Sequence, residues 1–144
     1  IINKPLNKEQ SYSILKGTGL NKTLKSNNVY CGGPVSTEKG FILHDSKYTS
    51  EETLLLNNTA GISFSDNIIN DIKNGGGPSS YRLIMGYSGW ASGQLEKELE
   101  NGDWMIMPSS EDLIFSKTDE YKWGIAISNL NIDTNDLSGQ TGVT

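Results

Sequence analysis

Short apolar runs, each closed by glycine, proline or a polar cluster, recur along the whole chain and predict β-strands. The run over residues 81–87, YRLIMGY, has the strongest strand pattern because aromatic and aliphatic side chains fill most of its positions. Ile1 and Ile2, which precede Pro5, are expected to form the end of a strand. The remaining strands are predicted over residues 29–31, 41–44, 53–56 and 104–107.

Between these runs, apolar residues spaced three or four apart predict amphipathic helices. Ser65 and Thr118 are expected to cap two of them, and Ser109 with Asp112 to form a capping box at a short helical turn that leads to residues 114–115. The polar residues 131–144 are expected to form a loose tail. The helices are predicted over residues 8–16, 66–74, 94–101 and 118–130.

Strands and helices are interspersed without an internal repeat or a linker, which predicts a single compact domain of the α+β (mixed α/β) class over residues 1–144. The chain has one Cys and one His, so a disulfide framework and a zinc site built from several such ligands are excluded. No apolar run approaches the roughly 20 residues that a membrane helix needs. The lone Cys31 favours a reducing compartment, and we expect a cytoplasmic protein.

The net charge of −5 lies entirely in the second half of the chain. Residues 1–72 carry seven basic and seven acidic side chains, whereas residues 73–144 carry five basic and ten acidic ones. Affinity for DNA comes largely from Lys and Arg on phosphates, and bidentate base readout needs Arg. Only the first 25 residues, with a local charge of +4, favour nucleic acid. Direct DNA binding is therefore disfavoured.

Eleven Lys against one Arg, with fourteen Asn and fourteen Ile, is the composition that an AT-rich genome produces. We interpret this bias as a sign of bacterial origin and not of function.

The segment over residues 86–90, GYSGW, approaches the nucleophile elbow G-x-S-x-G of serine hydrolases but has Trp90 in place of the last glycine. A catalytic triad would also have to recruit His44, the one imidazole in the chain. A hydrolase that uses Ser88 and His44 is therefore the weakest of the functions considered, and no catalytic residue is assigned.

The same segment joins a predicted strand to a predicted helix, an arrangement in which backbone N–H groups can hold a small anion. It matches neither the Walker phosphate loop nor G-x-G-x-x-G. The alternative is that its glycines serve tight turns around Trp90. The candidate ligand-binding residues are Gly32, Gly33, Pro34, His44, Tyr87, Gly89, Trp90, Gly93 and Gln94.

Other chemical sites are poorly supported by the sequence. Residues 131–135 alternate oxygen ligands as a calcium loop does, but Asp136 stands where that loop needs glycine. Cys31 lies on a short strand and is expected to be a small buried hydrophobe. No metal site and no cofactor is predicted.

Two segments together resemble the bacterial YqgE/AlgH family. The first covers residues 29–35 (VYCGGPV) and 40–44 (GFILH), and the second covers residues 86–90 (GYSGW) and 93–98 (GQLEKE). Residues 1–5, IINKP, are similar to the family's GLVINKP element, which normally follows an opening strand and turn that this chain is expected to lack. Ser88 stands where the family often has Ala, which further disfavours Ser88 as a nucleophile.

The resemblance implies a single compact domain with a branched, partly barrel-like β-sheet surrounded by helices. It also implies a regulator of transcription without agreed catalytic residues. Combined with the acidic second half, this favours a non-enzymatic regulatory or interaction protein that acts through an unknown protein partner. The alternatives are a module that binds a small anion or metabolite at residues 90–94 and, last, the Ser88–His44 hydrolase.

Overall fold

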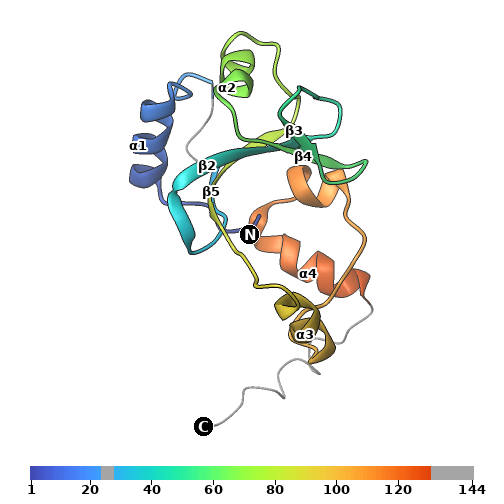
Figure 1. The fold of residues 1–144 in the computed structure, drawn as a ribbon. Helices are drawn as coiled ribbons and strands as arrows, with labels where there is room; N and C mark the ends of the chain where they lie inside the picture. The colour runs from blue at the N-terminus through green and yellow to red at the C-terminus, as the bar shows by residue number, and fades with distance from the viewer. Residues whose placement is uncertain (24–27, 131–144) are drawn as a thin grey trace.

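The structure, a computed structural model, describes residues 1–23 and 28–130. It is a single α+β domain built on a five-stranded mixed sheet with the strand order β1-β5-β2-β4-β3 (Figure 1). This confirms the predicted fold class. In chain order the elements are α1 (Lys8–Thr18), β1 (Val29–Cys31), β2 (Val35–Asp45), β3 (Thr53–Leu55), β4 (Ala60–Ser63), α2 (Asp66–Lys73), β5 (Tyr81–Tyr87), α3 (Gln94–Glu100), the π-helical turn η2 (Asp112–Ser116) and α4 (Asp119–Asn129).

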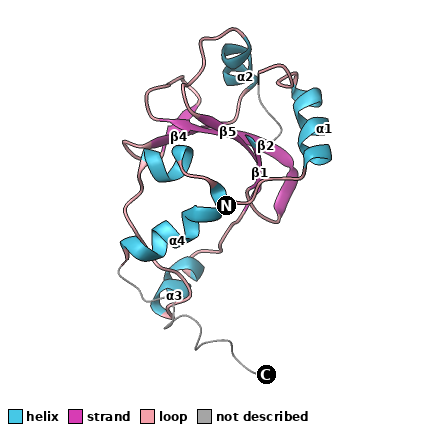
Figure 2. Cartoon of the chain, turned by 180° about the vertical axis from the view of Figure 1, so that it is seen from behind, coloured by secondary structure: helices cyan, strands magenta, loops and turns pink. Residues whose placement is uncertain are grey.

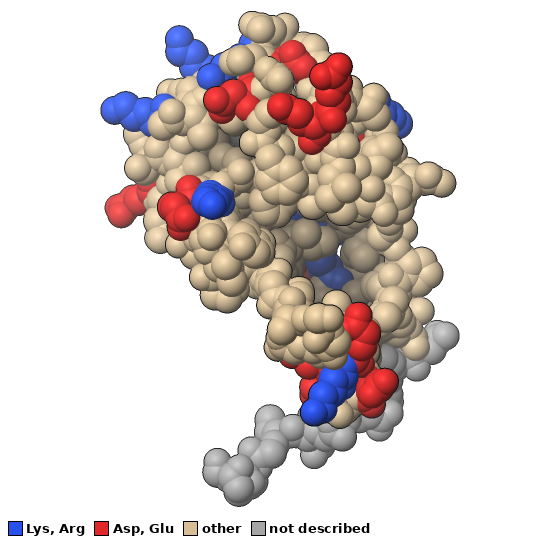
Figure 3. Space-filling view, in the orientation of Figure 1, with Lys and Arg blue, Asp and Glu red and all other residues tan. Residues whose placement is uncertain are grey.

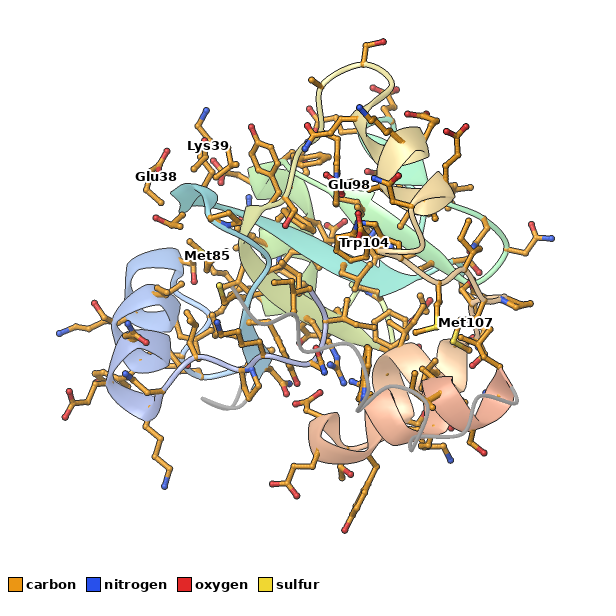
Figure 4. All side chains as sticks on the ribbon, turned by 90° about the horizontal axis from the view of Figure 1, so that it is seen from below. Glu38, Lys39, Met85, Glu98, Trp104 and Met107 are labelled. Carbon is orange, nitrogen blue, oxygen red and sulfur yellow. The ribbon has the colours of Figure 1, made fainter. Side chains whose placement is uncertain are left out.

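The sheet is organised around the long strand β2, which pairs antiparallel with both β5 and β4. β1 pairs parallel with β5, and β3 pairs antiparallel with β4. The register of β2 against β5 shifts between Val35 and Gly40, and Glu38 and Lys39 lie at this irregular tip (Figure 4). The first residues of the chain run antiparallel beside β1 and bond to it, with a single bridge between Pro5 and Tyr30.

The two faces of the sheet carry separate cores, because successive side chains of a strand point to opposite sides. Val29, Ile42 and Leu83 face α1 and α2, where they form one buried cluster with residues of these helices. Their neighbours along the strands face the other way and are covered by η2 and α4. Figure 2 shows α1 and α2 on one side of the sheet and α4 on the other. The second cluster consists of Tyr30, Leu43, Ala60 and Ile84, with Ile114 and Phe115 of η2 packed against it.

Several predicted elements need correction. Residues 104–107 do not form a strand, and β4 was not predicted. The capping box is wrong, because η2 begins at Asp112 and the hydroxyl of Ser110 accepts from the N–H of Leu113 at 3.1 Å. Ser65 and Thr118 stand at the predicted N-cap positions, but neither makes a capping hydrogen bond. The predicted tail and the calcium-like loop lie outside the described residues.

Candidate functional site

The two glycine segments of the sequence meet at the end of β5, where they pack backbone against backbone. A Cβ atom added to Gly32 would lie 2.2 Å from the carbonyl oxygen of Gly86, and one added to Gly33 would lie 2.3 Å from the carbonyl carbon of Tyr87. Gly86 itself has a φ of 70°, which few other residues adopt. Pro34 follows at the surface. These glycines are accounted for by close backbone packing.

His44 lies apart from these segments, on the side of the sheet that faces α1 and α2. Its ring is fully buried and its edge contacts the ring of Tyr48. Nδ1 lies 2.7 Å from the carbonyl oxygen of Asp45, which can only accept, so Nδ1 carries the proton. Nε2 then accepts from the hydroxyl of Ser63 at 3.0 Å. Both ring nitrogens of His44 are therefore engaged within the protein.

The Ser88–His44 pair of the hydrolase hypothesis does not form. His44 pairs with Tyr81 in the ladder between β2 and β5, and Ser88 follows seven residues further along the chain. At about 3.3 Å per strand residue, the two side chains lie roughly 20 Å apart. The structure contradicts this hypothesis, because His44 of β2 lies beside the start of β5, whereas Ser88 follows the end of β5.

The start of α3 is held together by a carboxylate of the protein itself. The indole N–H groups of Trp90 and Trp104 donate to Oε2 of Glu98 at 2.9 and 2.7 Å, and Nε2 of Gln94 donates to Oε1 at 2.9 Å. The hydrogen bonds from Trp104, Trp90 and Gln94 lower the pKa of Glu98. Figure 4 shows Glu98 and Trp104 pointing toward each other. The side-chain donors of Trp90 and Gln94 thus already bind Glu98, and ligand binding by the nine candidate residues stays a prediction.

A cavity of about 410 Å³ opens on the other face of the sheet, and its lining is almost wholly apolar. Leu43 and Ala60 of the sheet form its buried floor. Ile2 and Asn3, residues 107–110, and α4 form its walls. Figure 3 shows the surface hollowed between the upper body of the molecule and its lower helices. A volume of this size suits a small organic molecule.

A cluster of buried charges borders this cavity. The guanidinium of Arg82 donates to the carboxylate of Asp119 at 3.0 Å and to the carbonyl oxygen of Ile2 at 2.8 Å. The ammonium of Lys122 donates to the same carboxylate oxygen at 2.8 Å, and the hydroxyl of Tyr30 donates to the other oxygen at 2.9 Å. Arg82 also lies 4.5 Å from the centre of the Tyr30 ring. One carboxylate therefore binds two cations and a phenol.

Burial governs the protonation of this cluster. It raises the pKa of Tyr30 to about 12, and it lowers the pKa of Lys122, although Asp119 partly offsets the latter effect. Burial alone would raise the pKa of Asp119, but hydrogen bonds from Lys122, Tyr30 and Arg82 lower it. The ion pairs with Asp119 bring two cations to one anion, and the phenol of Tyr30 stays neutral below its raised pKa.

Sequence reasoning missed this site although one signal was present. Arg82 is the one arginine of the chain and the one charged residue inside its most apolar strand, which indicates a buried partner. Asp119 follows directly after the predicted cap Thr118, and neither Asp119 nor Lys122 was predicted as a site residue. Over residues 1–23 and 28–130, no three His, Cys, Asp or Glu side chains gather as a metal site would require. Within the same residues no helix is long and apolar enough to cross a membrane.

Relatives of this chain are found among bacterial proteins, which supports the bacterial origin that the composition indicates. A UPF0301 protein of Thiobacillus denitrificans is 33% identical over 143 residues, with 99% of this chain and 77% of the relative covered. A UPF0301 protein of Rickettsia canadensis is 42% identical over 114 residues, with 79% of this chain and 60% of the relative covered. The match therefore spans less than two thirds of the length of the Rickettsia protein.

The fold is also found in solved structures. The solution structure of the AlgH protein from Pseudomonas aeruginosa superimposes with a TM-score of 0.71 at 32% identity, covering 99% of this chain and 77% of that one. A crystal structure of a protein from Corynebacterium diphtheriae, at 24% identity and a TM-score of 0.59 over 74% of this chain and 58% of that one, shares the fold alone. The profile of the AlgH-like family matches residues 1–135. Fold, sequence relatives and family profile agree, and the chain belongs to the AlgH-like family.

Proposed function

We propose that this protein is a non-enzymatic regulatory protein of the cytoplasm, which binds a small, largely apolar molecule and acts on transcription through a protein partner. The observation that carries the proposal is the cavity between the sheet and α4, which has an apolar floor of Leu43 and Ala60. Exposed apolar side chains that line the cavity, among them Leu56 and Trp123, would be buried under a ligand, and the hydrophobic effect favours that burial.

Binding is favoured over catalysis by the chemistry of the cavity walls. Acid–base or nucleophilic catalysis needs at least a nucleophile and a base within hydrogen-bond reach. The cavity offers one charged side chain, Lys122, and the hydroxyls of Ser109 and Ser110 at its rim. The hydroxyl of Ser109 is engaged with Asn57 and Thr59. These side chains can bind a ligand, but they do not provide the nucleophile and base that catalysis needs.

Action through a protein partner is favoured over direct DNA binding by the distribution of charge. Residues 96–136 carry ten acidic side chains and three lysines, a stretch that repels the phosphate backbone. Arg82, the one residue suited to bidentate base readout, is 7% exposed and held by Asp119 and backbone carbonyls. A sequence-specific, salt-dependent gel shift by the pure protein would contradict this part of the proposal.

The cavity is tested with the neutral apolar dye N-phenyl-1-naphthylamine, whose fluorescence rises on transfer from water to an apolar site. We expect saturable binding by the wild-type protein and loss of binding in Ala126→Phe, because Ala126 of α4 lines the cavity and the added ring fills it. Ser128→Phe is the matched control, since Ser128 lies exposed on the same helix and does not line the cavity. Equal dye binding by Ala126→Phe and Ser128→Phe, with both variants folded, would refute binding at this site.

A further inference from the structure

Lys122 is the one charged residue among those that line the cavity, and its ammonium pairs with Asp119 beside it. The Lys122 residue is 4% exposed, although lysine is rarely buried without full pairing. Its neighbours along the wall include Leu43, Ala60 and Ile114. A lone cation in such surroundings is costly unless an anion and enough hydrogen-bond acceptors accompany it.

Lys122 has unused hydrogen-bond donors. An ammonium group carries three N–H donors, and one of them binds Oδ1 of Asp119 at 2.8 Å. No other acceptor for this group is found among the residues that the structure describes. The Asp119 carboxylate also accepts from Arg82 and Tyr30, so three of its roughly four lone-pair sites are taken.

The charge of the cluster is likewise unbalanced. Arg82 and Lys122 contribute two positive charges, Asp119 contributes one negative charge, and Tyr30 is neutral at physiological pH because its pKa is raised to about 12. The described cluster therefore has a net charge of +1, and it lies between the apolar cavity, which Lys122 lines, and a more polar hollow, which Tyr30, Arg82 and Asp119 line. Charge pairs act more strongly on the buried side of the cluster than in water, because the effective dielectric constant is low there.

We infer that the cavity selects molecules with an apolar body and a carboxylate, and that Lys122 is the residue that binds this carboxylate. The inference rests on the proposed function and names its ligand class, aliphatic carboxylic acids of medium chain length. An incoming carboxylate brings the cluster to two cations and two anions and accepts from the unused N–H donors of Lys122. The hydrocarbon chain then covers the floor of Leu43 and Ala60.

The test compares decanoate with decanol as competitors of the bound dye, because the two differ in the head group and share the apolar chain. A hydrogen bond to a charged partner is worth roughly 10- to 150-fold in affinity, so decanoate is expected to displace the dye at least about tenfold more tightly than decanol does. In Lys122→Met this advantage disappears, while dye and decanol bind as before. Lys117→Met is the matched control, since Lys117 lies on the surface, pairs with Asp112 and does not line the cavity.

The outcomes separate this inference from the proposed function. If neither dye nor competitor binds, the proposed function fails. If the dye and decanol bind but decanoate has no advantage, or keeps its advantage in Lys122→Met, the carboxylate selectivity is refuted and the apolar site stands. Lys122→Met is expected to fold because the Arg82–Asp119 pair stays neutralised.

A second measurement needs no variant: the labelled carboxyl carbon of decanoate bound to the wild-type protein should titrate at a lower pH than that of free decanoate. A higher titration pH would mean that burial without a counter-ion dominates, and would overturn the inference.

Discussion

The two faces of the sheet use neighbouring residues of the same strands for different purposes. Ile42 and Leu83 face α1 and α2 and are packed into a closed apolar core. Leu43 and Arg82, one position away on the same strands, face η2 and α4, where the packing leaves a cavity and a cluster of buried charges. The first face packs apolar side chains against two helices, although a pocket opens beside α1 as well, and the second face combines its cavity with a cluster of charges that stability alone does not require.

The charge cluster sharpens this contrast. A buried ion pair is weak evidence for stability, because well-packed apolar residues of similar volume often do as well or better. Removing one member of such a pair is nevertheless strongly destabilising, since its partners remain buried and charged. Loss of an apolar side chain should therefore destabilise the protein less on the second face than on the first. Loss of the Asp119 carboxylate should destabilise it more than either.

The largest effect is expected for Asp119→Asn, which leaves the buried cations Arg82 and Lys122 without an anion. We expect the free energy of unfolding in urea to fall by about 3–5 kcal/mol. Asp112→Asn is the control, because Asp112 pairs with Lys117 at the surface, and no measurable loss is expected. Similar losses in the two variants would mean that the cluster is as well hydrated as a surface pair, and the contrast between the faces would fail.

Truncation of one leucine on each face gives the next largest difference. Leu15 of α1 is 2% exposed within the closed core, and Leu15→Ala is expected to cost about 2–4 kcal/mol. Leu113 lines the cavity and is half-buried, so Leu113→Ala removes fewer contacts and is expected to cost at most about 1 kcal/mol. Equal costs in urea unfolding would show that the second face is as tightly packed as the first.

The sequence predicted most of the first face because its elements have long, regular patterns. β5 has the predicted bounds, and the predicted ends of α1 and α2 agree within two residues. β4 was missed because Ala60 and Gly61 carry little strand signal, and the strand is defined by its pairing with β2 and β3. Residues 104–107 have an apolar strand pattern but pair with no strand of the sheet, and the indole of Trp104 bonds to Glu98 of the preceding helix.

The second face was not predictable in the same way, because it is assembled from distant segments. The Asp119 carboxylate joins Tyr30, Arg82 and Lys122, and two of these lie 89 and 37 residues away along the chain. The cavity depends on how far η2 and α4 stand from the sheet, which no local pattern records. The candidate residues at 86–94 were prominent in the sequence because of their glycines, and glycines report tight backbone packing as readily as ligands.

A third, smaller effect follows from the titration of Tyr30. Burial raises the pKa of its phenol from 10.0 to about 12, so the folded state favours the neutral form. The stability that this contributes is fully present below pH 10 and is lost as the pH rises from 10 to about 12, where the unfolded chain releases the proton first. Urea unfolding of the wild-type protein should therefore weaken across this interval more steeply than that of Tyr30→Phe. If the free energies of unfolding of the wild-type protein and of Tyr30→Phe changed in parallel with pH, the phenol of Tyr30 would be in contact with water.

The smallest effect on global stability is expected at α3, which belongs to neither face and contributes no buried residue. Glu98→Gln removes the carboxylate that joins Trp90 to Trp104, whose rings lie 5.7 Å apart, and it leaves both cores untouched. The urea midpoint should stay unchanged while the near-ultraviolet circular dichroism of the tryptophans falls. Glu100→Gln, on the same helix, should alter neither the midpoint nor the dichroism.

Because the pKa of Glu98 is lowered from 4.5, the tryptophan signal of the wild-type protein should persist as the pH falls below 4.5 and disappear only when this carboxylate is protonated. A drop in the urea midpoint of Glu98→Gln alone would show that α3 unfolds together with the cores, so that the comparison of two faces would have to include this third region.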